Sequence, residues 1–274
     1  MLSMLRFELR RMWESVTFRL AVFCSCLLAG ISAAQQFGYY LQGMDHISVF
    51  YRWIGEYNLT FGSNYMFLII PLLSALGYSH SGCTDRTRGY LQHILTRTSR
   101  RNYFLAKFLI TVFSGGSIFA SGVLFNYLLL TMFMPIEIPD PANLTSFTDP
   151  FRFCSIWYYS KPHLFLAAWI GVVFLWGSAM ALIGLVCGMF THHAALTAVV
   201  PFLLFISEGV VAAYVMQKAI LFLGNALLEL TWTDMLYAGT PGSAPTEYIL
   251  ITIGSIMGVA AVIYTIRVNR YECL

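Results

Sequence analysis

The chain has 274 residues, of which 58% are hydrophobic and only 11% are charged. Because soluble domains carry about 25% charged residues, this composition excludes an ordinary soluble globular protein and indicates a membrane protein. The formal net charge of only +3 argues against a nucleic-acid-binding surface.

The first element in the chain is a predicted amphipathic helix over residues 1–16. One side of its helical wheel is apolar and carries Leu2, Leu5, Leu9, Met12, Trp13 and Val16. The other side is polar and carries Arg6, Arg10, Arg11 and Glu14. Such a helix lies along the membrane surface with its apolar face in lipid. The alternatives are a helical extension of the first span and a secretory signal, although this stretch is long and well patterned for a signal.

Six segments that follow are long and apolar enough to cross a bilayer. A spanning helix needs about 20 apolar residues, because lipid offers no partner for an unpaired backbone amide or carbonyl. The predicted spans cover residues 19–40, 64–81, 103–134, 163–190, 194–217 and 247–267. The sequence therefore predicts an all-α, polytopic membrane protein with a single transmembrane domain over residues 1–274. The third span exceeds the bilayer thickness, so we expect it either to bend near Gly115-Gly116 or to project into water, with Lys107 at the projecting end.

The positive charges indicate the orientation, because Lys and Arg gather in cytoplasmic segments. If both termini are cytoplasmic, the inner side holds Arg6, Arg10, Arg11, Arg19, Arg86, Arg88, Arg97, Arg100, Arg101, Lys107, Arg267 and Arg270. The outer side then holds only Arg52, Arg152, Lys161 and Lys218. This asymmetry predicts a multi-pass protein of the cell membrane with both termini inside.

The basic segment 82–102 between the second and third spans predicts a further short helix. Leu91, Ile94 and Leu95 stand at i, i+3 and i+4, while Arg88 and Arg97 lie elsewhere on the wheel. Such a helix could lie beneath the membrane and offer a surface to a soluble partner. The alternative is an ordinary basic loop that binds anionic lipid.

Two outer segments and one acidic residue within a predicted span have further predicted roles. Residues 135–162 combine prolines with aromatic residues and predict an irregular cap, and residues 218–237 predict a re-entrant or interfacial helix. Glu208 lies near the middle of the fifth span, where a carboxylate is costly unless it is paired, protonated or turned to water. It is either part of a substrate path or a structural hydrogen-bonding group, and Asn126 of the third span is a candidate partner.

No catalytic or cofactor motif accompanies these segments. The sequence has no G-x-x-x-x-G-K-[ST] phosphate loop, no H-E-x-x-H zinc motif and no G-x-S-x-G nucleophile elbow. The cysteines show no metal-binding or disulfide spacing. We therefore expect no enzymatic activity and no cofactor in this chain, so that any ATP hydrolysis would belong to a separate subunit.

The order of these elements and some local sequences resemble the permeases of ABC-2 type transporters, which have the type V exporter fold. The matching stretches are Pro71-Leu72-Leu73-Ser74-Ala75-Leu76, Arg88-Gly89-Tyr90-Leu91, the segment 95–108 and Ser114-Gly115-Gly116. The resemblance spans most of the chain and is closest to small bacterial members.

The resemblance implies a permease in a bacterial plasma membrane that dimerises with itself or a sister chain. Two cytoplasmic ATPase subunits would bind ATP and Mg²⁺ and drive export of a peptide, antibiotic, lipid or similar amphipathic substrate. The coupling helix would use Arg88, Tyr90, Leu91, Ile94, Leu95 and Arg97. The connecting helix would use Leu5, Leu9, Met12 and Trp13. Glu208 and Asn126 would line the translocation path, and residues 218–237 would form the outer gate.

Two other functions fit the same residues. The chain could be a membrane partner of an ATPase that transports nothing, such as a regulatory or assembly subunit. It could also be a proton-coupled secondary transporter that uses Glu208, although such folds usually contain internal repeats and the halves of this sequence show no convincing match.

Overall fold

The computed structural model describes residues 1–42, 48–53, 61–139, 153–219 and 246–270. Within these residues the secondary structure is helical and contains no strand. The helices are α1 (Leu2–Glu14), α2 (Val16–Leu41), α3 (Val49–Arg52), α4 (Phe61–Tyr78), α5 (Ser81–Thr87), α6 (Tyr90–Leu95), α7 (Arg100–Phe133), α8 (Ser155–Ser160), α9 (Pro162–Phe190), α10 (Leu196–Ala219) and α12 (Thr246–Asn269).

Five helices among the described residues are long and apolar enough to cross a membrane, which indicates a multi-pass membrane protein. These candidate spans are Val16–Leu41, Tyr65–Thr87, Arg100–Phe133, Pro162–Phe190 and Glu247–Asn269. They correspond to five of the six predicted spans. The remaining one, residues 194–217, lies in α10, whose described apolar part, Leu196–Glu208, is shorter than the others. The sixth span and the orientation of the termini therefore stay predictions, and most of the predicted re-entrant segment 218–237 lies outside the described residues.

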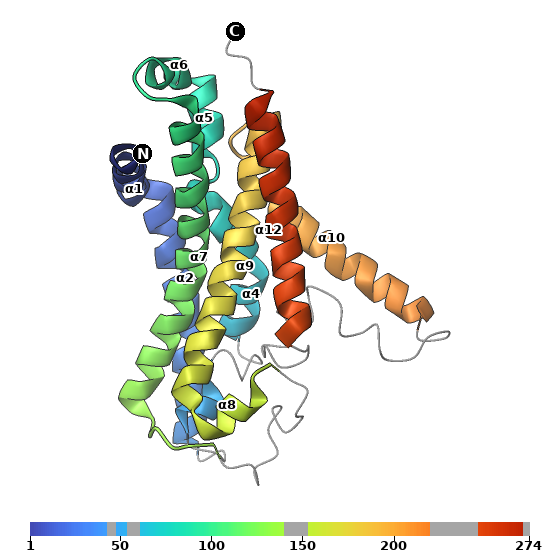
Figure 1. Ribbon diagram of the computed structural model, residues 1–274. Coiled ribbons are helices and arrows are strands. Elements are labelled where there is room, and N and C mark those ends of the chain that lie inside the picture. Colours follow the sequence, from blue (N-terminus) through green and yellow to red (C-terminus); the bar gives the residue numbers. More distant parts are fainter. Residues whose placement is uncertain (43–47, 54–60, 140–152, 220–245, 271–274) are drawn as a thin grey trace.

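The long helices form a bundle in which α7 packs against α2, α4 and α9, and α4 packs against α2 and α9. α1 is seen nearly along its axis in Figure 1 while α7 and α9 run down the view, so α1 lies crosswise to the bundle. α10 leans away from the other long helices (Figure 1). We call the end that carries α1, α5, α6 and the last turn of α12 the basic end; α8 lies at the opposite end (Figure 1).

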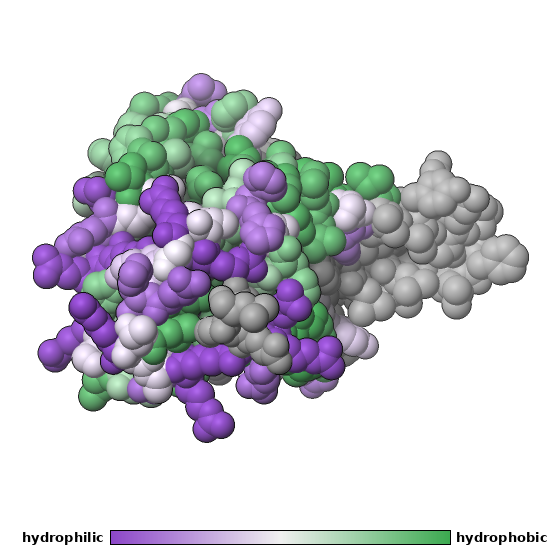
Figure 2. Space-filling model, turned by 90° about the horizontal axis from the view of Figure 1, so that it is seen from above, coloured by the Kyte–Doolittle hydropathy of each residue, from purple (hydrophilic) through white to green (hydrophobic). Residues whose placement is uncertain are grey.

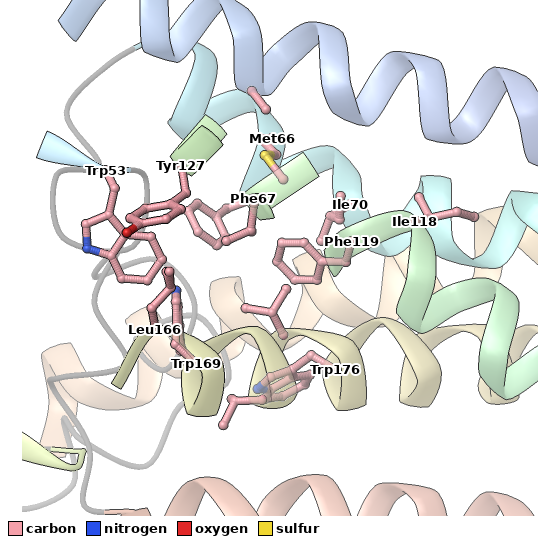
Figure 3. Packing of buried hydrophobic residues seen from close by; sticks show 14 of the residues in the cluster. Trp53, Met66, Phe67, Ile70, Ile118, Phe119, Tyr127, Leu166, Trp169 and Trp176 are labelled. Carbon is pink, nitrogen blue, oxygen red and sulfur yellow. The ribbon is translucent and has the colours of Figure 1, made fainter. Parts of the chain in front are cut away.

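Large aromatic side chains fill the core toward the end opposite α1. Trp53, which follows α3, meets Trp169 of α9 edge to face at 6.4 Å between ring centroids. Phe67 of α4 meets Phe119 of α7 in the same manner at 5.7 Å. Figure 3 shows these rings converging from the different helices. Edge-to-face contacts of this kind stabilise a packed core beyond the burial of area alone.

Small residues allow α7 and α9 to approach closely. A Cβ atom added at Gly115 would lie 2.4 Å from the backbone oxygen of Gly177, and one added at Gly177 would lie 2.4 Å from the oxygen of Gly115. Such distances are far below van der Waals contact, so both positions require glycine. Helix pairs in membranes commonly use small residues in this way, because lipid supplies no hydrophobic force to drive them together.

Gly115→Val should therefore force α7 and α9 apart and greatly reduce the yield of folded protein. Overpacking of this kind typically costs about 1–3 kcal/mol and more where the backbone must move. The control is Gly171→Val on α9, because nothing lies within 4 Å of a Cβ atom at Gly171. Size-exclusion profiles and thermal unfolding in detergent should separate the two variants. Equal behaviour of both would contradict this description of the helix crossing.

Candidate functional site

The most unusual feature of the basic end is a set of buried charges contributed by three separate helices. They begin with Glu8, which lies on α1 in a buried row with Met4 and Met12. Residues four apart share one face of a helix, so this row packs α1 onto the bundle. A carboxylate in such a row requires a partner from the helix it faces.

Lys107 of α7 is that partner. Its Nζ lies 2.8 Å from Oε2 of Glu8 and 2.8 Å from Oδ2 of Asp85 on α5. All three side chains are at most 1% exposed. The sequence-based expectation that the Lys107 end of this helix projects into water is wrong for the side chain, because Lys107 is enclosed by the carboxylates of two other helices.

Arg11 of α1 is the fourth charged residue of this set. Its guanidinium donates two hydrogen bonds to the two carboxylate oxygens of Asp85, one of them at 2.9 Å. Burial lowers the pKa of Arg11, but the hydrogen bonds and the charge of Asp85 outweigh it and raise that pKa above its ordinary value. Arg11 therefore stays charged at any accessible pH. Its guanidinium also lies 5.1 Å from the ring centroid of Tyr90 at the start of α6.

Two tyrosines complete the hydrogen bonding of the carboxylates. The hydroxyl of Tyr78 donates to Oε2 of Glu8 at 2.6 Å, and that of Tyr103 donates to Oδ2 of Asp85 at 2.8 Å. The Lys107 ammonium lies 5.0 Å and 5.6 Å from the centroids of these two rings. The rings therefore shield the ammonium and stabilise it through their π faces. We call Glu8, Arg11, Tyr78, Asp85, Tyr103 and Lys107 the charge cluster.

The charge cluster is balanced, with two carboxylates and two cations. Burying a charge is tolerated only when partners and hydrogen bonds compensate the lost hydration. A relative movement of α1, α5 or α7 would separate these groups, so the charge cluster favours movement of the three helices as one body. Its ion pairs join α1, α5 and α7. Among the described residues there is also no group of three His, Cys, Asp or Glu side chains placed to hold a metal ion.

α5 is also fastened to the end of α9. Nη1 of Arg86 donates to the carbonyl oxygen of Met189 at 2.8 Å, and Nη2 donates to that of Thr191. The last carbonyls of a helix have no partner within the helix, so a guanidinium placed there satisfies them and favours the helix dipole. Arg86 thus extends the joined body from α1, α5 and α7 to α9.

α6 lies directly on this body. It starts after Gly89, whose φ of +72° is in the left-handed region that glycine adopts without strain. Leu91 is buried in a second apolar cluster that also contains Met4 and Tyr103, and Ile94 and Leu95 pack against the same cluster. The apolar face of α6 therefore holds it onto the bundle.

The other residues predicted for the coupling helix lie on the outer surface. The exposed residues in and around α6 are Arg88, Tyr90, Gln92, His93, Thr96 and Arg97. The basic end is seen face on in Figure 2, where hydrophilic surface gathers between hydrophobic flanks. A soluble partner that docks on α6 would thus meet polar side chains, and it would meet Leu91 only if α6 moved.

The predicted apolar face of α1 is partly buried against the bundle and partly exposed. Met12 is buried and Leu5 packs partly against both apolar clusters, whereas Leu9 and Trp13 are exposed. The buried face is the row with Glu8, and the exposed apolar residues lie beside it. The helix is therefore amphipathic as predicted, but only part of its apolar face contacts the protein.

The two residues predicted for a translocation path lie on different helices, Asn126 on α7 and Glu208 on α10. Nδ2 of Asn126 on α7 donates to the carbonyl oxygen of Ala29 on α2 at 2.9 Å, and Asn126 is fully buried. Glu208 is half-buried on α10. The hydrogen bond of Asn126 joins α7 to α2, which is a structural role in this arrangement.

Sequence reasoning missed Glu8 and Asp85 as members of a site. A weak signal was available, because Glu8 stands four residues from both Met4 and Met12 and so interrupts an apolar row.

A scan against family models finds no match to this chain, and a search of curated proteins finds no similar sequence.

Proposed function

We propose that this chain is the membrane permease subunit of an ATP-driven transporter and that a separate soluble ATPase docks on the outer face of α6. The observation that carries the proposal is the attachment of α6 to the charge cluster. A short helix exposes polar residues at the end of a membrane bundle, and α5, which precedes it, is fixed to α1, α7 and the end of α9.

This attachment supports a mechanical role for α6. A force on α6 would pass through Leu91 and the adjoining α5 to Asp85, and from there to Lys107 and Glu8. α1 and α7 would move with it, because separating these charges costs free energy. A partner that binds one arrangement of this body more tightly than another would shift the permease between states, as coupling to ATP requires.

The distribution of charge supports binding of the partner on the cytoplasmic side. Most of the cations of the chain lie at the basic end, including Arg88, Arg97 and Arg101 around α6. Cationic segments remain on the cytoplasmic side of membranes. In this proposal the basic end is cytoplasmic, where ATP is available, and the transported molecule is an amphipathic compound moved outward.

The test is co-purification from the native membrane in a mild detergent. We expect an ATPase with Mg²⁺-dependent activity to accompany the wild-type chain. The double substitution Gln92→Asp and His93→Asp should reduce its amount at least about tenfold, because two added carboxylates in a docked interface must be desolvated. Both side chains are exposed, so the membrane part should remain folded.

The control is Asn269→Asp with Arg270→Asp, which places two carboxylates on exposed positions at the end of α12 and, because it also removes a cation, changes the charge of the basic end more than the α6 variant does. This control should retain the ATPase. Loss of the ATPase from both double variants would sink the assignment of α6, and its absence from the wild-type preparation would sink the proposed function. Thermal unfolding of each variant verifies that the fold is preserved.

A further inference from the structure

A groove between α1 and α7 is the strongest further candidate for a binding site. It has a volume of about 430 Å³ and is lined by Arg6, Leu9, Arg10, Trp13, Glu14 and Phe113. Five of these residues belong to α1, and Phe113 belongs to α7. The groove shares no residue with the charge cluster or with α6.

The floor of the groove is Phe113, an apolar residue that belongs to an exposed ridge of α7. Leu105, Leu109 and Phe113 stand four residues apart and are each at least 40% exposed, so they form one ridge on the surface of this helix. The ridge lies within a candidate membrane span, where the surrounding solvent is hydrocarbon. Trp13, on the rim, is 64% exposed and is of the residue type that settles at membrane interfaces.

The rim of the groove carries a net positive charge. Arg10 pairs with Glu14 at 2.7 Å, and this pair is exposed to solvent. Arg6 pairs with no carboxylate among the described residues. Because positions 6 and 10 are four residues apart, their guanidinium groups emerge on one side of α1, opposite the row that contains Glu8. The groove thus combines one uncompensated cation with an apolar channel.

We propose that the groove binds one anionic phospholipid. Its phosphate would lie between Arg6 and Arg10, and an acyl chain would pass Trp13 and Leu9 and descend along Phe113. A soluble anion would gain nothing from the apolar floor, and a neutral lipid would gain less from the cations. The inference rests on the membrane character of the chain and is independent of the proposed transport function.

The experiment titrates the delipidated full-length chain in detergent with phosphatidylglycerol and with phosphatidylcholine of the same acyl chains, and counts bound lipid by native mass spectrometry. We expect one phosphatidylglycerol to bind about tenfold more tightly than phosphatidylcholine, since cations near a membrane surface each favour anionic lipid. Arg6→Gln with Arg10→Gln should abolish this preference.

The control removes two exposed cations elsewhere at the basic end, Arg101→Gln with Arg270→Gln, and should keep the preference. A second arm adds soluble glycerol phosphate, which should not displace the lipid. Equal binding of the two lipids, an unchanged preference in the Arg6 and Arg10 variant, its loss in the control, or displacement by glycerol phosphate would each overturn the proposal.

Discussion

Lys107→Met is expected to be the most destabilising single substitution at the basic end. It leaves Glu8 and Asp85 buried with only Arg11 to balance them. Removing one partner of a buried ion pair costs about 3–5 kcal/mol, which corresponds to a drop of about 10 °C in unfolding temperature for a chain of this size. Thermal unfolding in detergent measures the effect.

Two controls separate charge balance from simple loss of a side chain. Arg101→Met removes an exposed cation from the first turns of the same helix and should change the unfolding temperature little. The double variant Glu8→Gln with Lys107→Met leaves the neutral pair of Arg11 and Asp85 and should recover part of the loss. If the double variant were no more stable than Lys107→Met, charge balance would not be what stabilises this site.

Arg11→Met should release α1 from the bundle without unfolding the long helices. The substitution removes both hydrogen bonds to Asp85 and the contact with Tyr90. Hydrogen bonds to charged groups contribute about 1.5–3 kcal/mol, so local opening of α1 should become at least about tenfold more frequent. Hydrogen–deuterium exchange should therefore accelerate over residues 2–14 and remain unchanged in α9.

Arg10→Met provides a close control, because Arg10 is the neighbour of Arg11 and forms only an exposed pair with Glu14. Exchange of α1 should stay near the wild-type rate in this variant. Equal acceleration in both variants would show that any lost cation loosens α1. No acceleration in Arg11→Met would show that the charge cluster does not hold α1 in place.

The long helices of this fold could be predicted from the sequence, because each is marked by a continuous run of apolar residues within one segment. An apolar run of about 20 residues must form a helix in lipid, and the five candidate spans each match a predicted segment within a few residues. The N-terminal helix was predictable for the same reason, since its apolar and polar residues alternate with the helical period. The short helices α3 and α8 carry no comparable signal.

The charge cluster could not be predicted, because its members lie far apart in the sequence. Glu8, Asp85 and Lys107 meet only after three helices have packed, and each alone resembles a surface charge. We expected Leu91, Ile94 and Leu95 to contact an ATPase, whereas in the structure Leu91 is buried in the second apolar cluster and the other two pack against it. An amphipathic pattern shows that a helix has an apolar face, but it does not show whether that face covers the bundle or a partner.

Photo-cross-linking in the native membrane tests the docking of an ATPase on α6 most directly. A benzophenone amino acid replaces His93, which is exposed on α6, or Leu109, which is exposed on the membrane-facing ridge of α7. If an ATPase docks on α6, position 93 cross-links to a soluble protein that hydrolyses ATP and position 109 does not. Labelling of lipid alone from position 93, or of the same proteins from both positions, would contradict it.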